Sequence, residues 1–151
     1  QSMHFAYLFN WAGQPWNTQK WSRSILDRYY GCGVANAYLG DEDQGQMSAW
    51  AVMASIGLFQ TDGGTSAVPV YELASPAFEK IVIDLGGKYG RGDRFVINAK
   101  NASRKNIYVQ SAYLNGEKLE SFRFPASELL KGGELSLEMG PEPAYKLFGK
   151  F

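Results

Sequence analysis

The sequence predicts an α+β protein in which a helical region precedes an antiparallel β-sandwich. All four tryptophans lie before residue 60, whereas most of the alternation between β-branched and polar residues lies after it. With 151 residues, the chain can bury a substantial core in one domain or two small ones. A stretch rich in Gly, Thr and Ser marks the change, so we divide the chain into helices at 1–62, a connection at 63–68 and a β-sandwich at 69–151.

Two helices are predicted within the first part. Between residues 15 and 30, large apolar residues recur at spacings of three and four, Pro15 suits the first helical position, and Gly31 suits a left-handed end. Residues 31–45 combine glycines and acids without periodicity and are predicted to form a loop. The next helix, 46–56, has almost no polar face, so we expect it to be buried on nearly all sides.

Beyond the connection the hydrophobic period changes to two, which is typical of strands. Asn115-Gly116 predicts a type I′ hairpin turn, because both central residues of that turn need a positive φ. Short strands joined by such turns are typical of an antiparallel β-sandwich. The expected strands are 70–73, 80–85, 94–99, 107–114, 118–124 and 134–139.

Composition excludes several classes of function. Fifteen Lys and Arg against fifteen Asp and Glu give a net charge of zero, so no positive field attracts nucleic acid, and we exclude it as a partner. Cys32 is the only cysteine, which excludes an intrachain disulfide and a Cys-based zinc site. The longest apolar runs are far shorter than the ~20 residues of a membrane-spanning helix, so no membrane span is expected.

Asp41, Glu42 and Asp43 directly precede the second predicted helix. In a structural interpretation they are solvated loop acids and a helix N-cap, favoured by the positive end of the helix dipole. In a functional interpretation, carboxylates fixed beside an apolar helix act as a general base or as oxygen ligands for calcium. An EF-hand is excluded, because counting from Asp41 places Gly45 at the fifth position instead of the sixth and Val52 where a bidentate Glu is needed.

His4 is the only histidine, so it has no second histidine for a metal site or an acid–base pair. A hydrogen-bonded role within its apolar segment is the alternative to a functional one. The tryptophans could stack on sugar rings, but at their helical spacing core packing is the interpretation we favour. Because the sequence opens inside an apolar stretch, we expect it to be part of a longer polypeptide.

Several motifs closely resemble the C-terminal part of glycoside hydrolase family 92, whose members are exo-acting α-mannosidases, most often described for α-1,2 links. The longest and most specific motif is the run GDEDQGQMSAW at residues 40–50. The other matching segments, which extend the resemblance over nearly the whole chain, are 7–10, 13–19, 75–76, 106–111, 114–116 and 139–140.

The resemblance implies an inverting, calcium-dependent enzyme whose catalytic centre lies in an (α/α)6 barrel. The first part of the chain would form the last helices of that barrel. Asp43 is the expected general base, with Asp41 as its neighbour or alternative, and Asp43 is also the expected calcium (Ca2+) ligand. His4, Glu42 and Gln46 are the expected substrate-binding residues. The general acid and the remaining calcium ligands would lie upstream of Gln1, so the chain alone would be inactive.

The same resemblance implies that mannose is released from the non-reducing ends of glycans at an extracytoplasmic location. The expected partners are a mannose-containing glycan and the upstream half of the same polypeptide. Two departures from the family pattern concern substrate specificity: Asn17, where a Lys is expected, and 124–126, where a His is common. The alternatives to an enzyme are a non-catalytic carbohydrate-binding or scaffold module and a purely structural cap.

Overall fold

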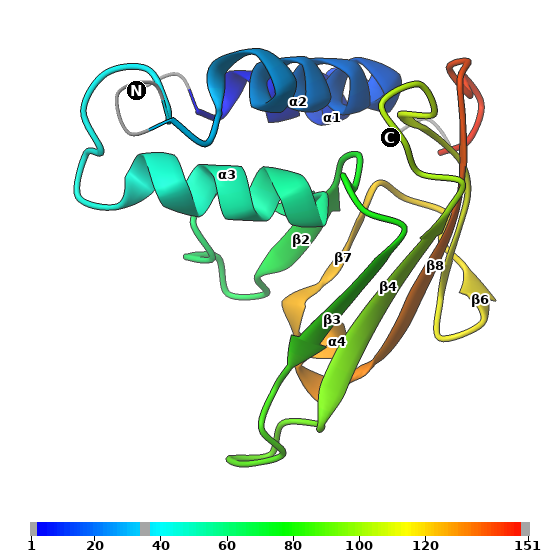
Figure 1. Cartoon of the computed structure of the whole chain (residues 1–151). Coiled ribbons are helices and arrows are strands. Elements are labelled where there is room, and N and C mark those ends of the chain that lie inside the picture. The colour runs from blue at the N-terminus through cyan, green and yellow to red at the C-terminus, as the bar shows by residue number, and fades with distance from the viewer. Residues whose placement is uncertain (1–2, 34–36, 149–151) are drawn as a thin grey trace.

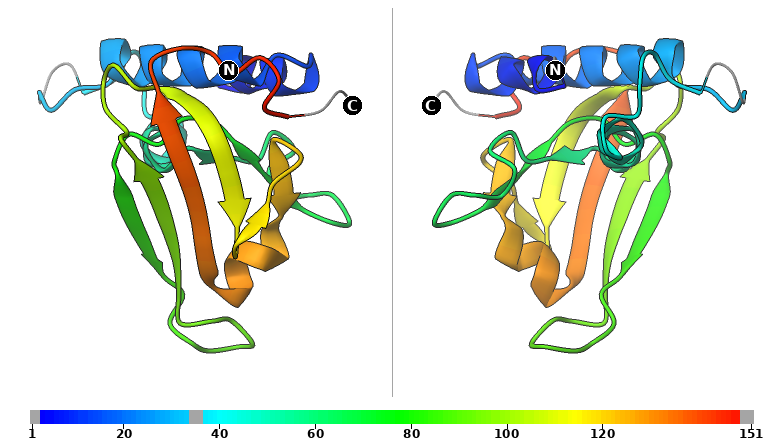
Figure 2. Two further views of the ribbon diagram at one scale, coloured as in Figure 1. Left: turned by 90° about the vertical axis from the view of Figure 1, so that its right-hand side faces the viewer. Right: turned by 90° about the vertical axis from the view of Figure 1, so that its left-hand side faces the viewer.

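In the computed structural model, which describes residues 3–33 and 37–148, a layer of helices lies across one end of two β-sheets (Figures 1 and 2). α1 and α2 pack against each other above α3, whereas α4 lies at the other end of the sheets (Figure 1). The chain is therefore α+β, as predicted. The helices are α1 (Phe5–Trp11), α2 (Pro15–Tyr29), α3 (Gln46–Ile56) and α4 (Ala126–Lys131).

The described residues form one three-stranded and one five-stranded sheet, and both contribute side chains to a shared hydrophobic cluster, while a second cluster lies among α1, α3 and the end of β2. The smaller sheet has the order β1-β2-β7 and is antiparallel throughout. The larger sheet has the order β3-β4-β8-β5-β6. The strands are β1 (Leu58–Phe59), β2 (Val70–Leu73), β3 (Lys80–Asp84), β4 (Arg94–Lys100), β5 (Tyr108–Leu114), β6 (Glu117–Lys118), β7 (Arg123–Pro125) and β8 (Gly133–Gly140).

The prediction of a wholly antiparallel sandwich is wrong, because β4 and β8 are parallel. Parallel neighbours need a crossover connection. The chain supplies it by leaving the larger sheet after β6, adding β7 to the smaller sheet and returning through α4. β1 precedes the predicted connection at 63–68 and pairs with β2 beyond it. The division into 1–62, 63–68 and 69–151 stays a prediction.

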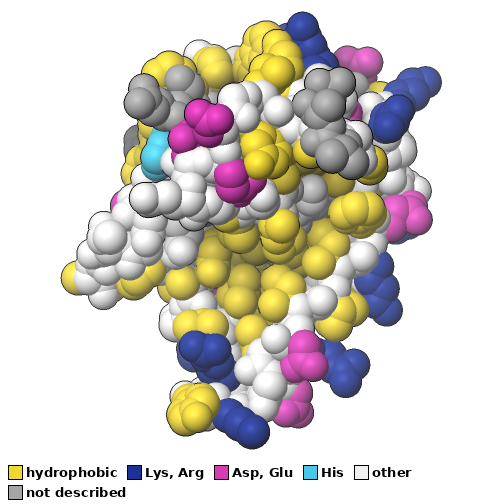
Figure 3. Space-filling model, turned by 60° about the vertical axis from the view of Figure 1, so that its left-hand side comes forward, with side chains coloured by type: hydrophobic (Ala, Val, Ile, Leu, Met, Phe, Trp, Pro, Cys, Tyr) yellow, Lys and Arg dark blue, Asp and Glu magenta, His cyan; other side chains and the backbone are white. Residues whose placement is uncertain are grey.

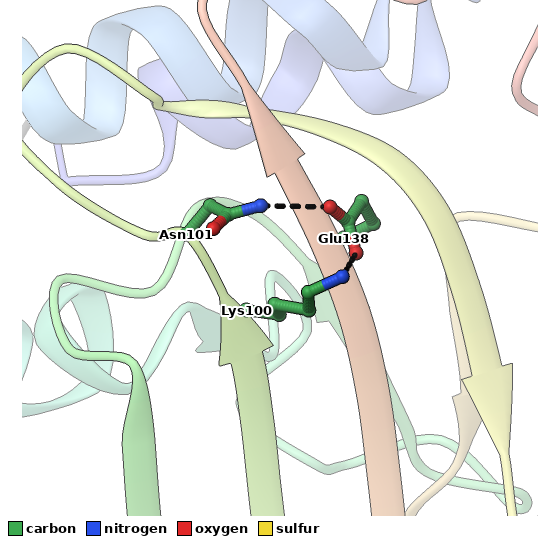
Figure 4. A network of polar contacts seen from close by, with 3 residues as sticks. All are labelled: Lys100, Asn101 and Glu138. Atoms are coloured by element: carbon green, nitrogen blue, oxygen red, sulfur yellow. Dashed lines mark hydrogen bonds and ion pairs between the residues drawn. The ribbon is translucent and has the colours of Figure 1, made fainter.

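A polar network marks the end of the parallel pair (Figure 4). Lys100 Nζ lies 3.2 Å from Glu138 Oε2, and Asn101 Nδ2 donates to Glu138 Oε1 at 2.7 Å. Asn101 has φ +67°, a left-handed conformation that Asn tolerates better than most residues. It therefore turns the chain out of β4 while its side chain ties the turn to β8. Exposed pairs of this kind contribute ~1 kcal/mol or less.

Polar contacts fix α2 to β5 and to the segments that follow β2 and β4. Gln19 Oε1 accepts the Val109 backbone N–H at 3.1 Å. The Arg23 guanidinium donates to the Pro76 carbonyl at 2.8 Å and to the Ser103 carbonyl at 3.3 Å. Burial is the main cause that lowers the pKa of Arg23. These contacts satisfy the Gln19 Oε1 atom and the terminal nitrogens of Arg23, although Arg23 Nε is buried without a hydrogen-bond partner among the described residues, and they hold the helical layer against the sheets.

The two predicted helices are confirmed at 15–29 and 46–56, but two details of the prediction are wrong. α2 ends with Tyr30 in an extended conformation, not with Gly31 in a left-handed one, and the Gly31 N–H donates to Ala37 O at 2.8 Å. Of the residues in α3, which are all described, only Trp50 and Ala54 are buried. Val52 is 57% exposed, because no other part of the described chain covers that face.

The loop and strand predictions hold in most places. The described residues of 31–45 form no helix or strand, while 34–36 lie outside the described residues. Asn115 and Gly116 have φ +52° and +85°, which confirms their turn. The single strand predicted at 118–124 is instead split between β6 and β7, which belong to different sheets. No other predicted strand is missing, although α1, β1 and α4 are not among the predicted elements.

The helical layer leaves apolar surface open. Phe5 is 65% exposed, and an apolar pocket of about 620 Å³ lies over α1 and α2. A second apolar pocket, of about 360 Å³, lies between α3 and β3, and hydrophobic side chains gather in a hollow on one face of the molecule (Figure 3). The pocket over α1 and α2 is lined by Phe5, Ala6, Leu8, Phe9, Ala12, Trp21 and Ile25.

No helix of the described chain combines the length and hydropathy needed to cross a membrane.

Candidate functional site

The acidic triplet enters α3 through a run of left-handed residues. Asp43, Gln44 and Gly45 have φ +51°, +62° and +88°, and the Asp43 carbonyl accepts the Gln46 N–H at 3.3 Å. Left-handed conformations are unfavourable for Gln and tolerated by Asp, and such strain is often found at functional sites. Asp41 and Asp43 are exposed, and neither carboxylate accepts a hydrogen bond or pairs with a cation within the described residues.

Glu42 differs from its two neighbours because the start of α3 uses its carboxylate. Glu42 Oε1 accepts the Ser48 N–H at 2.9 Å, and the Glu42 carbonyl accepts the Met47 N–H at 3.2 Å. Hydrogen bonds from the side chain and amide of Ser48, and then from the Tyr38 hydroxyl, lower the pKa of Glu42. The structural interpretation of the triplet therefore fits Glu42, whose carboxylate accepts a backbone N–H of the first helical turn that has no partner within the helix. Its predicted role in binding substrate stays a prediction.

A pocket of about 220 Å³ beside α3 brings together two of the predicted substrate-binding residues, His4 and Gln46. The ring of His4 meets that of Phe59 edge-on, with centroids 5.8 Å apart. Complete small-molecule sites usually have ~300–1,000 Å³ and combine aromatic walls with a few polar groups. This pocket therefore has the chemistry of one part of such a site. It is lined by Met3, His4, Gln46, Ala49, Trp50, Met53, Phe59, Gln60 and Gly63.

Sequence reasoning missed Phe59 and Gln60, which form one wall of this pocket. Phe59 lies in a strand of two residues, too short for alternation to reveal it. Neither Asp41 nor Asp43 lines the pocket, although the Asp43 carbonyl bonds to the backbone of Gln46, which does. The acids and the pocket thus meet at the start of α3.

The tryptophans divide between core and surface. Trp50 is buried, stacks on Tyr30 at 5.2 Å and donates through Nε1 to the Met3 carbonyl at 3.0 Å, which confirms core packing for this residue. Trp11 and Trp21 are exposed, so core packing is wrong for them in the described chain.

The residues that the structure describes do not by themselves fit a calcium site. Calcium takes 6–8 oxygen ligands, many of them carboxylates. Within the described residues, no group of three or more His, Cys, Asp or Glu side chains is placed to hold a metal ion. Asp43 can supply a carboxylate, but the described chain offers no cluster around it.

Comparison with known proteins identifies relatives along almost the whole chain. Residues 1–141 match the glycosyl hydrolase family 92 catalytic domain. The family GH92 alpha-mannosidase BT3965 from Bacteroides thetaiotaomicron is 35% identical, with a TM-score of 0.84, over 96% of this chain and 18% of its own. The family GH92 inverting mannosidase BT2199 from the same organism is also 35% identical, with a TM-score of 0.84, over 97% of this chain and 19% of its own.

A curated relative is a secreted glycosidase from Arthroderma benhamiae, 28% identical over 90% of this chain and 17% of its own length. The chain thus spans about a fifth of the length of the relatives it matches. The matched segment includes the acidic triplet, α3 and both sheets. Since the family match extends over residues 1–141 of 151, the chain belongs to glycosyl hydrolase family 92.

Proposed function

We propose that this chain is the C-terminal part of an inverting α-mannosidase that releases mannose from the non-reducing ends of glycans, with α-1,2 links as its substrates. The observation that carries the proposal is the left-handed loop of Asp43, which opens into α3 beside the pocket of His4 and Gln46. The 35% identity with two bacterial mannosidases of the family supports it. In the whole protein, α1, α2 and α3 belong to an (α/α)6 barrel.

Asp43 is proposed as the general base. Inversion needs one carboxylate that takes a proton from water and one acid that protonates the leaving oxygen, the two lying ~6.5–9.5 Å apart. The carboxylate of Asp43 is exposed and, within the described residues, accepts no hydrogen bond that would compete with a water molecule for its oxygens. It is thus free to accept the proton of a water molecule. Asp41 is its neighbour or alternative, and the acid is supplied by another part of the polypeptide.

The pocket is proposed to hold part of the sugar. His4 and Gln46 offer hydrogen bonds to hydroxyl groups, while Trp50 and Phe59 offer apolar walls. Glu42 contributes to binding from the loop that it ties to Ser48. Calcium is proposed as a cofactor with Asp43 among its ligands, and the other ligands come from outside this chain.

The product anomer tests the proposed reaction. We expect the whole protein, incubated with an α-1,2-linked mannobiose, to release β-mannose first, because inversion leaves the hydroxyl on the opposite face. Proton NMR during the first minutes measures the anomer before it equilibrates.

Removal of calcium with a chelator is expected to abolish the release of mannose, and addition of calcium is expected to restore it. Release of α-mannose, or no release with calcium present, contradicts the proposal.

The open apolar faces support the upstream half of the polypeptide as a partner, in an extracytoplasmic protein like the secreted relative. A monomer's largest exposed apolar patch is usually ~300–600 Å², and larger ones mark interfaces. We expect the isolated chain to self-associate at micromolar concentration through the face with Phe5 and Trp21. Sedimentation velocity measures this. Phe5→Ser is expected to weaken the association and Tyr89→Ser, on an exposed turn, to leave it unchanged. A clean monomer contradicts the prediction.

A further inference from the structure

Glu72 is a buried carboxylate that the proposed reaction does not use. It is 1% exposed and, within the part of the chain that the structure describes, has no cationic partner. Burial of a carboxylate is costly unless hydrogen bonds satisfy its oxygens. Here Glu72 Oε1 accepts the hydroxyl and, at 3.4 Å, the backbone N–H of Thr61, while Oε2 accepts Asn10 Nδ2 at 3.4 Å. The carboxylate thus joins β2 to α1 and to the segment after β1.

The segment that Glu72 holds forms one wall of the pocket. Phe59 is the register partner of Glu72 in the β1–β2 pair. The ring of Phe59 stacks on that of Tyr7, with centroids 4.0 Å apart and planes at 10°, and its edge contact with His4 continues the same wall. Gln60, which lies between Phe59 and Thr61 in the sequence, also lines the pocket, whereas Thr61 does not.

The two ends of this wall are fixed differently. At Phe59 it is fixed by strand pairing and stacking. The β1–β2 ladder ends at the Phe59–Glu72 pair, so Gln60 follows the last paired residue. Beyond it, the bonds from Thr61 to Glu72 are the next tie to β2. The position of the Gln60 side chain in the pocket therefore depends on the Thr61–Glu72 contact.

We infer that Glu72 and Thr61 are positioning residues of the substrate pocket: the buried carboxylate holds the Thr61 hydroxyl and thereby sets Gln60, next to the separately fixed Phe59, against the sugar. The inference rests on the proposed function, which gives the pocket its substrate. Neither residue lines the pocket, so they act through the wall and not by touching substrate.

Thr61→Val and Thr61→Ser are the matched pair that tests the inference. Valine keeps the shape of threonine and loses the hydroxyl, whereas serine keeps the hydroxyl. In the whole protein, Thr61→Val is expected to raise KM for an α-mannoside about fivefold, the factor that one lost hydrogen bond of typical net strength gives, with kcat within about twofold. Thr61→Ser is expected to keep the wild-type KM. Thr61→Ala, which also lacks the hydroxyl, is the second variant if the valine variant does not fold.

Two kinetic results overturn the inference. A variant without the hydroxyl that keeps the wild-type KM, whatever its melting temperature, assigns the contact a structural role only. Equal KM increases in the valine and serine variants exclude the hydroxyl as the link. If the wild-type protein turns over no mannoside, the proposed function fails by itself. Amide hydrogen exchange over 59–63 then decides: faster exchange in Thr61→Val than in Thr61→Ser supports the link, and equal rates overturn it.

Discussion

Asp43→Asn in the whole protein is expected to lower kcat for an α-mannoside by about 10²–10⁴, the usual contribution of a general base. Asparagine keeps the shape of the side chain and tolerates the left-handed φ of +51°, but it cannot take the proton of the attacking water. Because the carboxylate of Asp43 makes no hydrogen bond within the described residues, the melting temperature is expected to stay unchanged. Steady-state kinetics with calcium present, beside thermal melts, measure both.

Three variants frame this result. Asp84→Asn makes the same change at the exposed carboxylate that ends β3, where Oδ1 accepts the Gly86 N–H, and is expected to leave kcat unaltered. Asp41→Asn is expected to cost less than Asp43→Asn, since it alters charge near the base without removing it. Glu42→Ala is expected to lower stability through the lost bond to Ser48.

An Asp43→Asn enzyme that keeps more than about a tenth of the wild-type kcat would show that another residue is the general base, because a general base normally contributes far more than tenfold to the rate.

The sequence predicts α2 and α3, but not α1 and α4, because the signals of α2 and α3 are local. The spacing of apolar residues after Pro15 and the apolar run at 46–56 depend on neighbours within a few turns. The same is true of the Asn115-Gly116 turn, where two positive φ angles follow from two residue types. Pattern reasoning failed where pairing is distant in sequence. β4 and β8 lie parallel because β7 and α4 carry the chain around, and no periodicity within either strand records that path.

The burial of α3 was overestimated for a different reason. An apolar helix face indicates that the face is buried in the whole protein, where parts outside this chain can cover it. Here Trp50 and Ala54 face the described chain, whereas Val52 faces outwards. The candidate site shows the same limit. The motif at 40–50 identifies Gln46 and the acids as site residues. The pocket wall at Phe59 and Gln60 depends instead on the pairing of Phe59 with Glu72, and no residue spacing in the sequence predicts that pairing.

The isolated chain of 151 residues is expected to hydrolyse no α-mannoside, although it carries Asp43 and the pocket of His4 and Gln46. An inverting reaction needs an acid that protonates the leaving oxygen, and the proposal places that acid in another part of the polypeptide. Loss of the acid alone costs about 10²–10⁴ in rate, and the open pocket orients the sugar poorly. The measurement compares an α-1,2-linked mannobiose with an aryl α-mannoside, each against a blank without protein.

The two substrates separate the ways in which this expectation can fail. An aryl group leaves easily and needs little help from an acid, whereas a sugar alkoxide must be protonated as it departs. Turnover of the aryl substrate alone would show that Asp43 and the pocket work as a base and a binding site without the rest of the protein. Turnover of both would place the acid within these 151 residues, and Asp41 would be the first carboxylate to test, because it is exposed beside the proposed base.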